Sequence, residues 1–250
     1  MNILNKIHIN KLTYIILTLS VITGQFRVIS LIAILLLFHG LGHIIVSKIF
    51  KWNISRIEIM PFGGNIKYDI SLDEKINKEL LVTIAGPLFQ LIFTYILINT
   101  NILSYTETIN IRNISYSLLL FNMLPIIPLD GSKLLFLLLN KISSYYKSHV
   151  ILIYTSIIFL LLFIINSLYN LTFEFVIIFL IINILNEYKN HNTIINKFLL
   201  EKYLYKNKFN KLKILKKINP KSIWKNRVNL FVINKKIIHE KQILKNYFKR

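Results

Sequence analysis

Residues 28–50 read VISLIAILLLFHGLGHIIVSKIF, an apolar run in which the first charged residue is Lys48. A transmembrane helix needs about 20 mainly apolar residues, so this run is long enough to cross a bilayer. It also carries two histidines, His39 and His43, four positions apart. Polar side chains inside a membrane are energetically costly and usually functional, so this run bears on both the fold class and the chemistry.

Five further apolar runs predict five more membrane helices, at approximately residues 12–26, 80–100, 114–139, 150–165 and 171–185. The composition agrees with this interpretation, because 54% of the residues are hydrophobic and only 17% are charged. Soluble domains usually contain about 25% charged residues. We therefore expect an all-α polytopic membrane protein with about six transmembrane helices.

The stretch between the second and third predicted spans has a different pattern. Ile57 and Ile59 alternate with polar residues, and Pro-Phe-Gly-Gly at residues 61–64 interrupts the run. Alternation followed by a glycine-containing turn is typical of two paired strands. The sequence therefore predicts a short β-hairpin at this point.

The composition changes after Glu187, where the chain becomes polar and rich in lysine. We therefore divide the chain into a membrane core, residues 1–187, and a small basic tail, residues 188–250. Within the tail, residues 194–204 could form an amphipathic helix, and residues 228–238 could form one or two strands.

The distribution of basic residues predicts the orientation in the membrane. With both termini in the cytoplasm, the outside loops would be residues 24–27, 101–113 and 166–170, which contain two basic residues. The inside segments that precede the tail, counted together with the inner ends of the adjoining spans, contain eleven. Because cytoplasmic loops carry an excess of Lys and Arg, we expect a multi-pass protein with both termini cytoplasmic.

The formal net charge of +20 admits two kinds of partner, a nucleic acid or an anionic membrane surface. Eighteen of the 31 basic residues follow Glu187, and most of the others flank apolar runs. No motif of interleaved basic and aromatic residues supports nucleic-acid binding. We expect the tail to contact anionic lipid and expect no nucleic-acid partner.

His39 and His43 share one face of the predicted helix, because four residues advance slightly more than one helical turn. Both rings could therefore reach one metal ion, as in the H-E-x-x-H helix of zinc proteases. The alternative is a pair of hydrogen-bonded core histidines. The chain has no cysteine, so any metal must be held by His, Asp or Glu.

The fourth predicted span contains Asn-Met-Leu-Pro-Ile-Ile-Pro-Leu-Asp-Gly at residues 122–131. Its two prolines must interrupt helical hydrogen bonding. Asp130 follows directly; taken alone, it could end a kinked helix and face cytoplasmic water. Taken with the two histidines, it would complete a site with three protein ligands and an open fourth position, as catalytic zinc requires.

Together these motifs resemble those of the site-2 protease family of intramembrane zinc metalloproteases, in particular its sporulation members. The resemblance covers approximately residues 10–205. It rests on the histidine pair, on residues 61–64, on Ala-Gly-Pro at residues 85–87, and on the N-x-x-P-x-x-P-x-D-G block, which is the most specific of the four.

The resemblance implies that His39, His43 and Asp130 hold zinc and that Asn122 helps to stabilise the oxyanion. It also implies that the predicted hairpin lies near the region where substrate enters. The expected substrate is a membrane-associated protein, by resemblance a pro-sigma factor, and two other membrane proteins are expected to regulate its cleavage.

Gly40 departs from the family pattern, which has Glu directly after the first histidine. The site then lacks the adjacent carboxylate that would take a proton from water, and loss of a general base typically costs about 10²–10⁴ in rate. Zinc binding does not need this carboxylate. The alternatives are a slowed protease, a noncatalytic zinc-retaining pseudoprotease that binds membrane proteins, and an ion carrier, which a single kinked span disfavours.

Two softer departures concern Gln90 and the tail. Gln90 stands where the family commonly has Asn, so an amide is retained. Sporulation members often carry a cytoplasmic CBS domain, whereas residues 188–250 hold no complete CBS pair; one interpretation of the tail is a remnant of a regulatory domain. The remaining histidines are expected to be solvated: His8, His149, His191 and His239.

Overall fold

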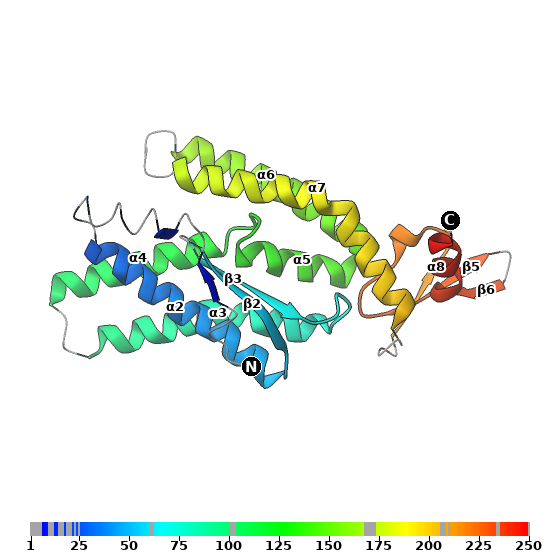
Figure 1. Ribbon diagram of the computed structural model, residues 1–250, viewed down its shortest axis with the longest axis horizontal. Coiled ribbons are helices and arrows are strands. Elements are labelled where there is room, and N and C mark those ends of the chain that lie inside the picture. Colours follow the sequence, from blue (N-terminus) through cyan, green and yellow to red (C-terminus); the bar gives the residue numbers. More distant parts are fainter. Residues whose placement is uncertain are drawn as a thin grey trace. The chain divides into compact units, whose positions relative to one another are not determined.

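The computed structural model describes residues 7–9, 13–14, 18, 22, 24, 26–60, 63–100, 104–167, 174–205, 209, 211–233 and 236–249. The chain divides into two compact units. One unit comprises Met1–Ile70 with Leu81–Met123, and the other comprises Ser71–Leu80 with Leu124–Arg250. Long helices dominate both units (Figure 1).

The first unit combines helices with a three-stranded sheet. Its helices are α2 (Phe26–Ile49), most of α3 (Ile76–Ile98) and α4 (Tyr105–Asn122), and its strands are β1 (Ile7–Ile9), β2 (Asn53–Met60) and β3 (Gly63–Asp69). Strands β2 and β3 pair antiparallel, which confirms the predicted hairpin. Strand β1 adds to β2 in parallel, a pairing that the local sequence pattern did not predict.

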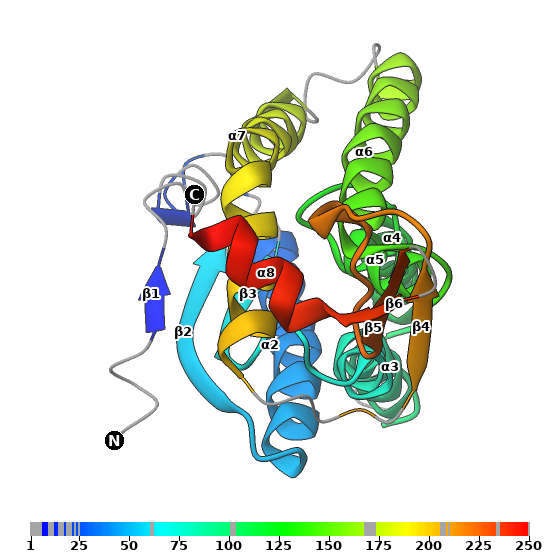
Figure 2. The same cartoon turned by 90° about the vertical axis from the view of Figure 1, so that its right-hand side faces the viewer.

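The second unit contains three long or medium helices and a small α/β tail. Its elements are α5 (Asp130–Ile142), α6 (Tyr145–Ser167), α7 (Glu174–Leu204), β4 (Leu212–Leu215), the 3-10 turn η3 (Pro220–Ser222), β5 (Val228–Ile233), β6 (Lys236–His239) and α8 (Glu240–Phe248). Strand β5 pairs in parallel with β4 and antiparallel with β6. Helix α8 packs against β5 and β6 (Figure 2).

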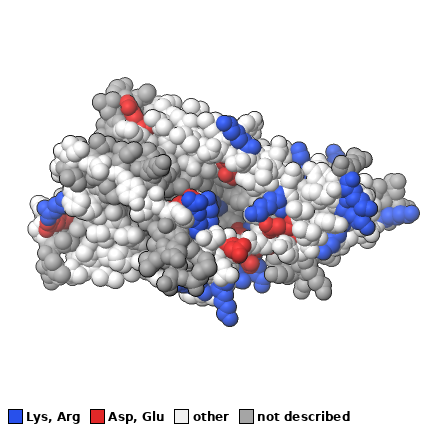
Figure 3. Space-filling view, in the orientation of Figure 1, with Lys and Arg blue, Asp and Glu red and all other residues white. Residues whose placement is uncertain are grey.

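Among the described residues, three helices are long and apolar enough to cross a membrane: Phe26–Ile49, Ile76–Ile98 and Tyr145–Ile165. They coincide with the second, third and fifth predicted spans. Large apolar side chains cover their outer faces; Leu37 of α2, for example, is 58% exposed. Such apolar surface is rare on soluble monomers and suits contact with lipid. In Figure 3 the charged side chains lie mainly over the middle and the right of the view, and few lie over its left part.

The count of six spans and the cytoplasmic termini stay predictions. The first predicted span, residues 12–26, lies mostly outside the described residues. The sixth, residues 171–185, falls in α7, which continues to Leu204 and crosses the expected domain boundary after Glu187.

The fourth predicted span, residues 114–139, is not one continuous helix. Helix α4 ends at Asn122, and α5 begins at Asp130. Between them lie Pro125 and Pro128, which lack the backbone N–H that a helix requires. The interruption predicted from the prolines is therefore confirmed, but it separates two helices rather than bending one.

Helix α6 supports this interruption with a single hydroxyl group. The Oγ atom of Ser156 accepts a hydrogen bond from the Ile127 N–H at 3.2 Å and lies 3.3 Å from the carbonyl oxygen of Pro125. Backbone groups released from a helix at membrane depth need partners of this kind inside the protein.

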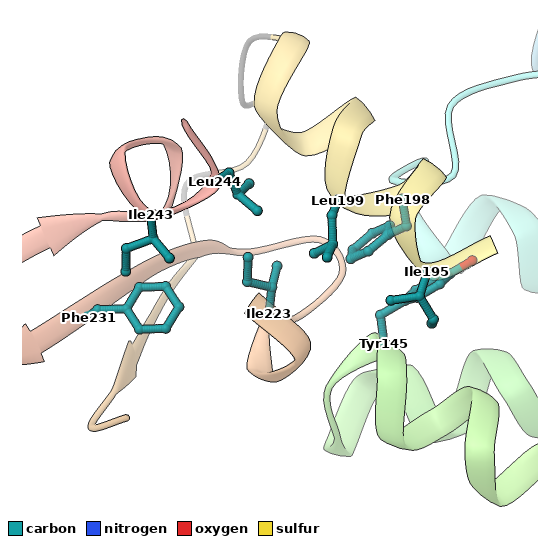
Figure 4. Close-up of a cluster of buried hydrophobic side chains, with 8 residues drawn as sticks. All are labelled: Tyr145, Ile195, Phe198, Leu199, Ile223, Phe231, Ile243 and Leu244. Atoms are coloured by element: carbon teal, nitrogen blue, oxygen red, sulfur yellow. The ribbon is translucent and has the colours of Figure 1, made fainter. Parts of the chain in front are cut away.

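The tail is a packed structure with its own apolar cluster (Figure 4). The cluster joins α7, η3, β5 and α8 to the first residue of α6, and its buried members are Tyr145, Ile195, Phe198, Leu199, Ile223, Phe231, Ile243 and Leu244. Phe231 and Leu244 have no exposed surface. The basic composition of this region therefore conceals a hydrophobic core.

Two buried lysines connect the tail to the segment that leads into α3. Lys202 Nζ lies 2.9 Å from Asp73 Oδ2, and Lys225 Nζ lies 2.6 Å from Glu79 Oε1. The Asn226 side chain accepts from the Ile76 N–H at 2.6 Å, at the start of α3. Residues 71–80 and the tail are thereby joined by buried ion pairs and hydrogen bonds.

Candidate metal centre

The two histidines of α2 point their rings toward a common place. Both side chains are buried, and their Nε2 atoms lie 3.2 Å apart. Tetrahedral zinc binds imidazole nitrogen at about 2.0–2.1 Å, which would separate two such nitrogens by about 3.3 Å. The spacing of His39 and His43 is therefore suited to two ligands on one ion.

The opposite ring nitrogens fix how each ring is protonated. His39 Nδ1 lies 3.0 Å from Gln90 Oε1, and His43 Nδ1 lies 2.8 Å from the carbonyl oxygen of Val82. Because both oxygens are acceptors, each Nδ1 donates its N–H to the oxygen that it faces, which leaves Nε2 as the nitrogen available to a metal ion. Each Nε2 then presents a lone pair, and two lone pairs facing one another repel. A cation between them removes that repulsion, which is the arrangement expected of metal-binding histidines.

Gln90 is held in place by a buried network in α3 and α4. Its side chain has no exposed surface, and its Nε2 atom donates to the carbonyl oxygen of Ser115 at 2.9 Å. Thr94 Oγ1 lies 2.6 Å from Ser115 Oγ. With the amide nitrogen engaged, Gln90 Oε1 is the atom left to face His39. The sequence marked this residue only as a departure from the family, whereas the structure makes it a partner of a candidate ligand.

Glycines allow α3 to approach these rings. A Cβ atom at Gly86 would collide with the His43 ring and lie 2.8 Å from His39 Nε2. A Cβ atom at Gly42 would lie 2.8 Å from the Cβ of Phe89, so α2 and α3 also pack closely there. Gly86 and Gln90 are four residues apart and share a helix face, a spacing from which the role of Gln90 could have been predicted.

Asp130 is the first residue of α5 in the second unit, and it is 5% exposed. Its Oδ1 atom lies 3.0 Å from Lys133 Nζ. Like His39 and His43, Asp130 is buried, and its carboxylate could serve as a ligand for a metal ion. Two imidazoles and one carboxylate are donors that zinc accepts.

Asn122 and Gly40, the remaining predicted site residues, lie in the first unit. Asn122 ends α4 and is buried, and its Nδ2 atom has no hydrogen-bond partner in the described part of the chain. Buried donors are rarely left so, and an amide of this kind is suited to a developing oxyanion. A Cβ atom at Gly40 would meet nothing within 4 Å, so the backbone leaves room there for a side chain.

One expectation about the other histidines is wrong. His149 was expected to be solvated, but it is 2% exposed and bonded at both nitrogens. Its Nδ1 atom lies 2.8 Å from His191 Nδ1, and its Nε2 atom lies 2.8 Å from Glu187 Oε1. His239 accepts from the Lys241 N–H at the start of α8. These contacts belong to α6, α7 and the tail rather than to α2.

The sequence pattern of peptidase family M50 matches residues 27–108 and 101–164. Stage IV sporulation protein FB of Bacillus subtilis (strain 168) is 31% identical over 215 residues, which cover 83% of this chain and 75% of that protein. This chain belongs to peptidase family M50. The expected resemblance to site-2 proteases is confirmed.

Two further relatives come from Methanocaldococcus jannaschii. A zinc metalloprotease is 28% identical over 156 residues, which cover 57% of this chain and 44% of that protein. The solved structure of a site-2 protease matches with a TM-score of 0.58 at 26% identity, covering 73% of this chain and 91% of that one. Membership of family M50 therefore supports an intramembrane metalloprotease that uses zinc.

Proposed function

We propose that this M50 chain is an intramembrane zinc metalloendopeptidase with His39, His43 and Asp130 as its metal ligands. The histidine pair carries the proposal, because the two Nε2 atoms lie 3.2 Å apart while both Nδ1 atoms are engaged with acceptors. When bound, zinc would polarise the scissile carbonyl group and assist attack by water. The side-chain amide N–H of Asn122 would donate a hydrogen bond to the oxyanion.

The role of Gly40 divides this proposal from its alternative. Glycine offers no carboxylate to accept a proton, so we propose that peptide hydrolysis by this chain is slow. The alternative is a noncatalytic pseudoprotease that retains zinc and binds membrane proteins, and Gly40 is the observation that favours it. The open space at Gly40 makes the two readily distinguishable, because a side chain can be restored there.

The substrate, the topology and the regulation belong to the same proposal. By resemblance to the sporulation members of the family, the substrate is a membrane-associated pro-sigma factor, and two membrane proteins restrain its cleavage. The proposal also includes six membrane spans with both termini in the cytoplasm. The membrane core comprises residues 1–187, and the basic tail, residues 188–250, contacts anionic lipid. Strands β2 and β3 would lie beside the path of the substrate.

Metal content tests the ligands. We expect the detergent-solubilised full chain to retain close to one zinc ion per chain after dialysis, as measured by mass spectrometry of the metal. His39→Asn and Asp130→Asn should lose most of it. The exposed residues His8 and Asp69 supply matched controls, since His8→Asn and Asp69→Asn should retain the ion. Unchanged zinc in Asp130→Asn would refute its assignment as a ligand.

Cleavage of a reconstituted pro-sigma factor tests the reaction. We expect Gly40→Glu to cleave about 10²–10⁴ times faster than the chain with Gly40, because it restores a general base. Gly40→Gln has nearly the same shape but cannot accept the proton, and it should stay slow. Equal rates in all three would mean that another group takes the proton. Zinc retention without cleavage, even in Gly40→Glu, would support the pseudoprotease instead.

A further inference from the structure

A cavity of about 690 Å³ lies within the second unit, and its lining residues do not include His39, His43 or Asp130. It is lined by the start of α3, the end of α5 and two stretches of the tail. Of the lining residues that the structure describes, none is acidic and six are basic: Lys75, Lys78, Lys141, Lys211, Lys225 and Arg227. Binding sites for small molecules commonly measure about 300–1,000 Å³, so this one has the size and the charge to hold an anionic group.

Four of these six cations have no acidic partner among the described residues, whereas Lys78 pairs with Glu74 and Lys225 with Glu79. The Lys225 ammonium group is buried and paired with Glu79 at 2.6 Å, so it forms part of the wall. In the part of the chain that the structure describes, no carboxylate pairs with the side chains of Lys75, Lys141 or Lys211. Three ammonium groups of like charge around one cavity repel one another, and an anion placed among them would relieve that repulsion.

The start of α3 adds to the positive potential. Ile76, Asn77 and Lys78, the first three residues of this helix, all line the cavity. The N-terminal end of a helix carries the positive end of its dipole and favours phosphate and other anions.

A buried amide oxygen indicates a second requirement of the ligand. Asn140 lines the cavity and has no exposed surface. Its Nδ2 atom donates to the carbonyl oxygen of Phe136 at 2.7 Å, whereas its Oδ1 atom has no hydrogen-bond partner among the described residues. An acceptor buried in this way needs a donor. A fully ionised phosphate group offers only acceptors, so it could not supply one. A hydroxyl group on the ligand could.

We propose that this cavity binds a phosphate ester that carries hydroxyl groups. The phosphate would interact with Lys75 beside the start of α3, Lys141 near the end of α5 and Lys211 of the tail. A hydroxyl group would donate to Asn140 Oδ1. The same chemistry occurs in the glycerol-phosphate headgroup of an anionic phospholipid and in a soluble polyol phosphate. The proposed site requires neither zinc nor cleavage. Its experiments can therefore fail or succeed separately from those on the proposed reaction.

Two probes separate the sources. We would titrate the detergent-solubilised full chain with glycerol 3-phosphate and, separately, with dihexanoylphosphatidylglycerol, and measure binding by calorimetry and by the shift in Tm. Saturable binding of glycerol 3-phosphate supports a soluble ester, and saturable binding of the lipid alone supports a headgroup. Failure of both probes to bind overturns the proposal.

Matched variants locate the binding. The double variant Lys141→Gln/Lys211→Gln should bind the effective probe at least about tenfold more weakly, because it removes two charge-assisted contacts to phosphate. Lys216→Gln/Lys249→Gln makes the same change in net charge at exposed tail residues and should bind normally. Equal weakening in both double variants would mean a diffuse charge effect and would overturn the site.

Ligand chemistry tests Asn140 without any mutation of a buried residue. Propyl phosphate has the phosphate but lacks the hydroxyl groups, so it should bind several-fold more weakly than glycerol 3-phosphate. Equal affinity for the two esters would refute the role of Asn140 Oδ1.

Discussion

At the scale of single residues, Gln90 acts directly on a proposed metal ligand. Its Oε1 atom holds the proton of His39 on Nδ1, and its own orientation is set by the carbonyl group of Ser115. Metal-binding histidines commonly depend on such a partner for their orientation and tautomer. The residue that departs from the family pattern therefore still performs a task that an amide can perform.

Gln90→Leu should weaken zinc binding while keeping most of the side-chain volume. His39 would lose the acceptor for its Nδ1 proton, and we expect zinc affinity to fall about 10–100-fold, as is typical when such partners are removed. Competition with a chromogenic chelator would measure the change. Thr94→Val leaves the Gln90 side chain and its hydrogen bonds to His39 and to the Ser115 carbonyl oxygen in place, so it should have a much smaller effect. Equal losses would refute this account.

Gly86→Ala should displace the histidine pair. The new methyl group would collide with the His43 ring and press on His39, so we expect most of the zinc to be lost. Gly40→Ala is the matched control on α2, since its methyl group meets nothing within 4 Å. It should keep the zinc and gain about 0.5–1 kcal/mol of helix stability. Metal analysis would measure the retained zinc, and Tm would measure the change in stability. Full zinc content in Gly86→Ala would contradict the packing described.

At the scale of elements, the break between α4 and α5 depends on a partner in α6. Ser156→Ala would leave the Ile127 N–H without the hydroxyl group that accepts from it. We expect a loss of about 1–3 kcal/mol, the usual consequence of stranding a buried donor. Thr155→Val tests specificity, because among the described residues the Thr155 hydroxyl bonds within its own helix, to the carbonyl oxygen of Leu152. Thermal unfolding in detergent should show a lower Tm for Ser156→Ala alone.

The contact between α6 and α7 should be sensitive to acid. Burial lowers the pKa of His191 below its ordinary value of 6.5, and the nearby charges of His149 and Lys221 act in the same direction, against Glu187. The unfolded chain therefore takes up its proton first as the pH falls through about 6.5, and the folded state loses stability. We expect Tm to decline between about pH 7 and pH 5.5, and His191→Asn to flatten that decline. An unchanged profile in the variant would contradict it.

Local pattern predicted the elements better than it predicted their partners. The apolar runs of α2, α3 and α6, the alternating residues of the hairpin and the prolines of the break all act over short stretches of sequence. By contrast, His149 meets His191 across 42 residues, and Lys225 meets Glu79 across 146. The solvated reading of His149 failed for this reason, since no nearby residue shows what a long-range contact will bury.

At the scale of the whole molecule, the tail should unfold when its apolar cluster is damaged. Phe231 is fully buried in β5, so Phe231→Ala should cost about 3–5 kcal/mol. Limited proteolysis in detergent should then cut the tail while leaving the apolar helices intact. Ile237→Ala alters a β6 side chain that is 69% exposed and should leave the tail resistant. Equal resistance in both variants would refute the assigned core.

The buried pairs Lys202–Asp73 and Lys225–Glu79 have a practical consequence for anyone who shortens this protein. A version that stops at residue 187 would lack both lysines yet keep both carboxylates. Asp73 lies just before α3, and Glu79 lies in its first turn. Losing the countercharge of a buried ion is strongly destabilising. Removal of the lysine-rich tail would therefore destabilise the start of α3, the helix that carries Ala-Gly-Pro at residues 85–87.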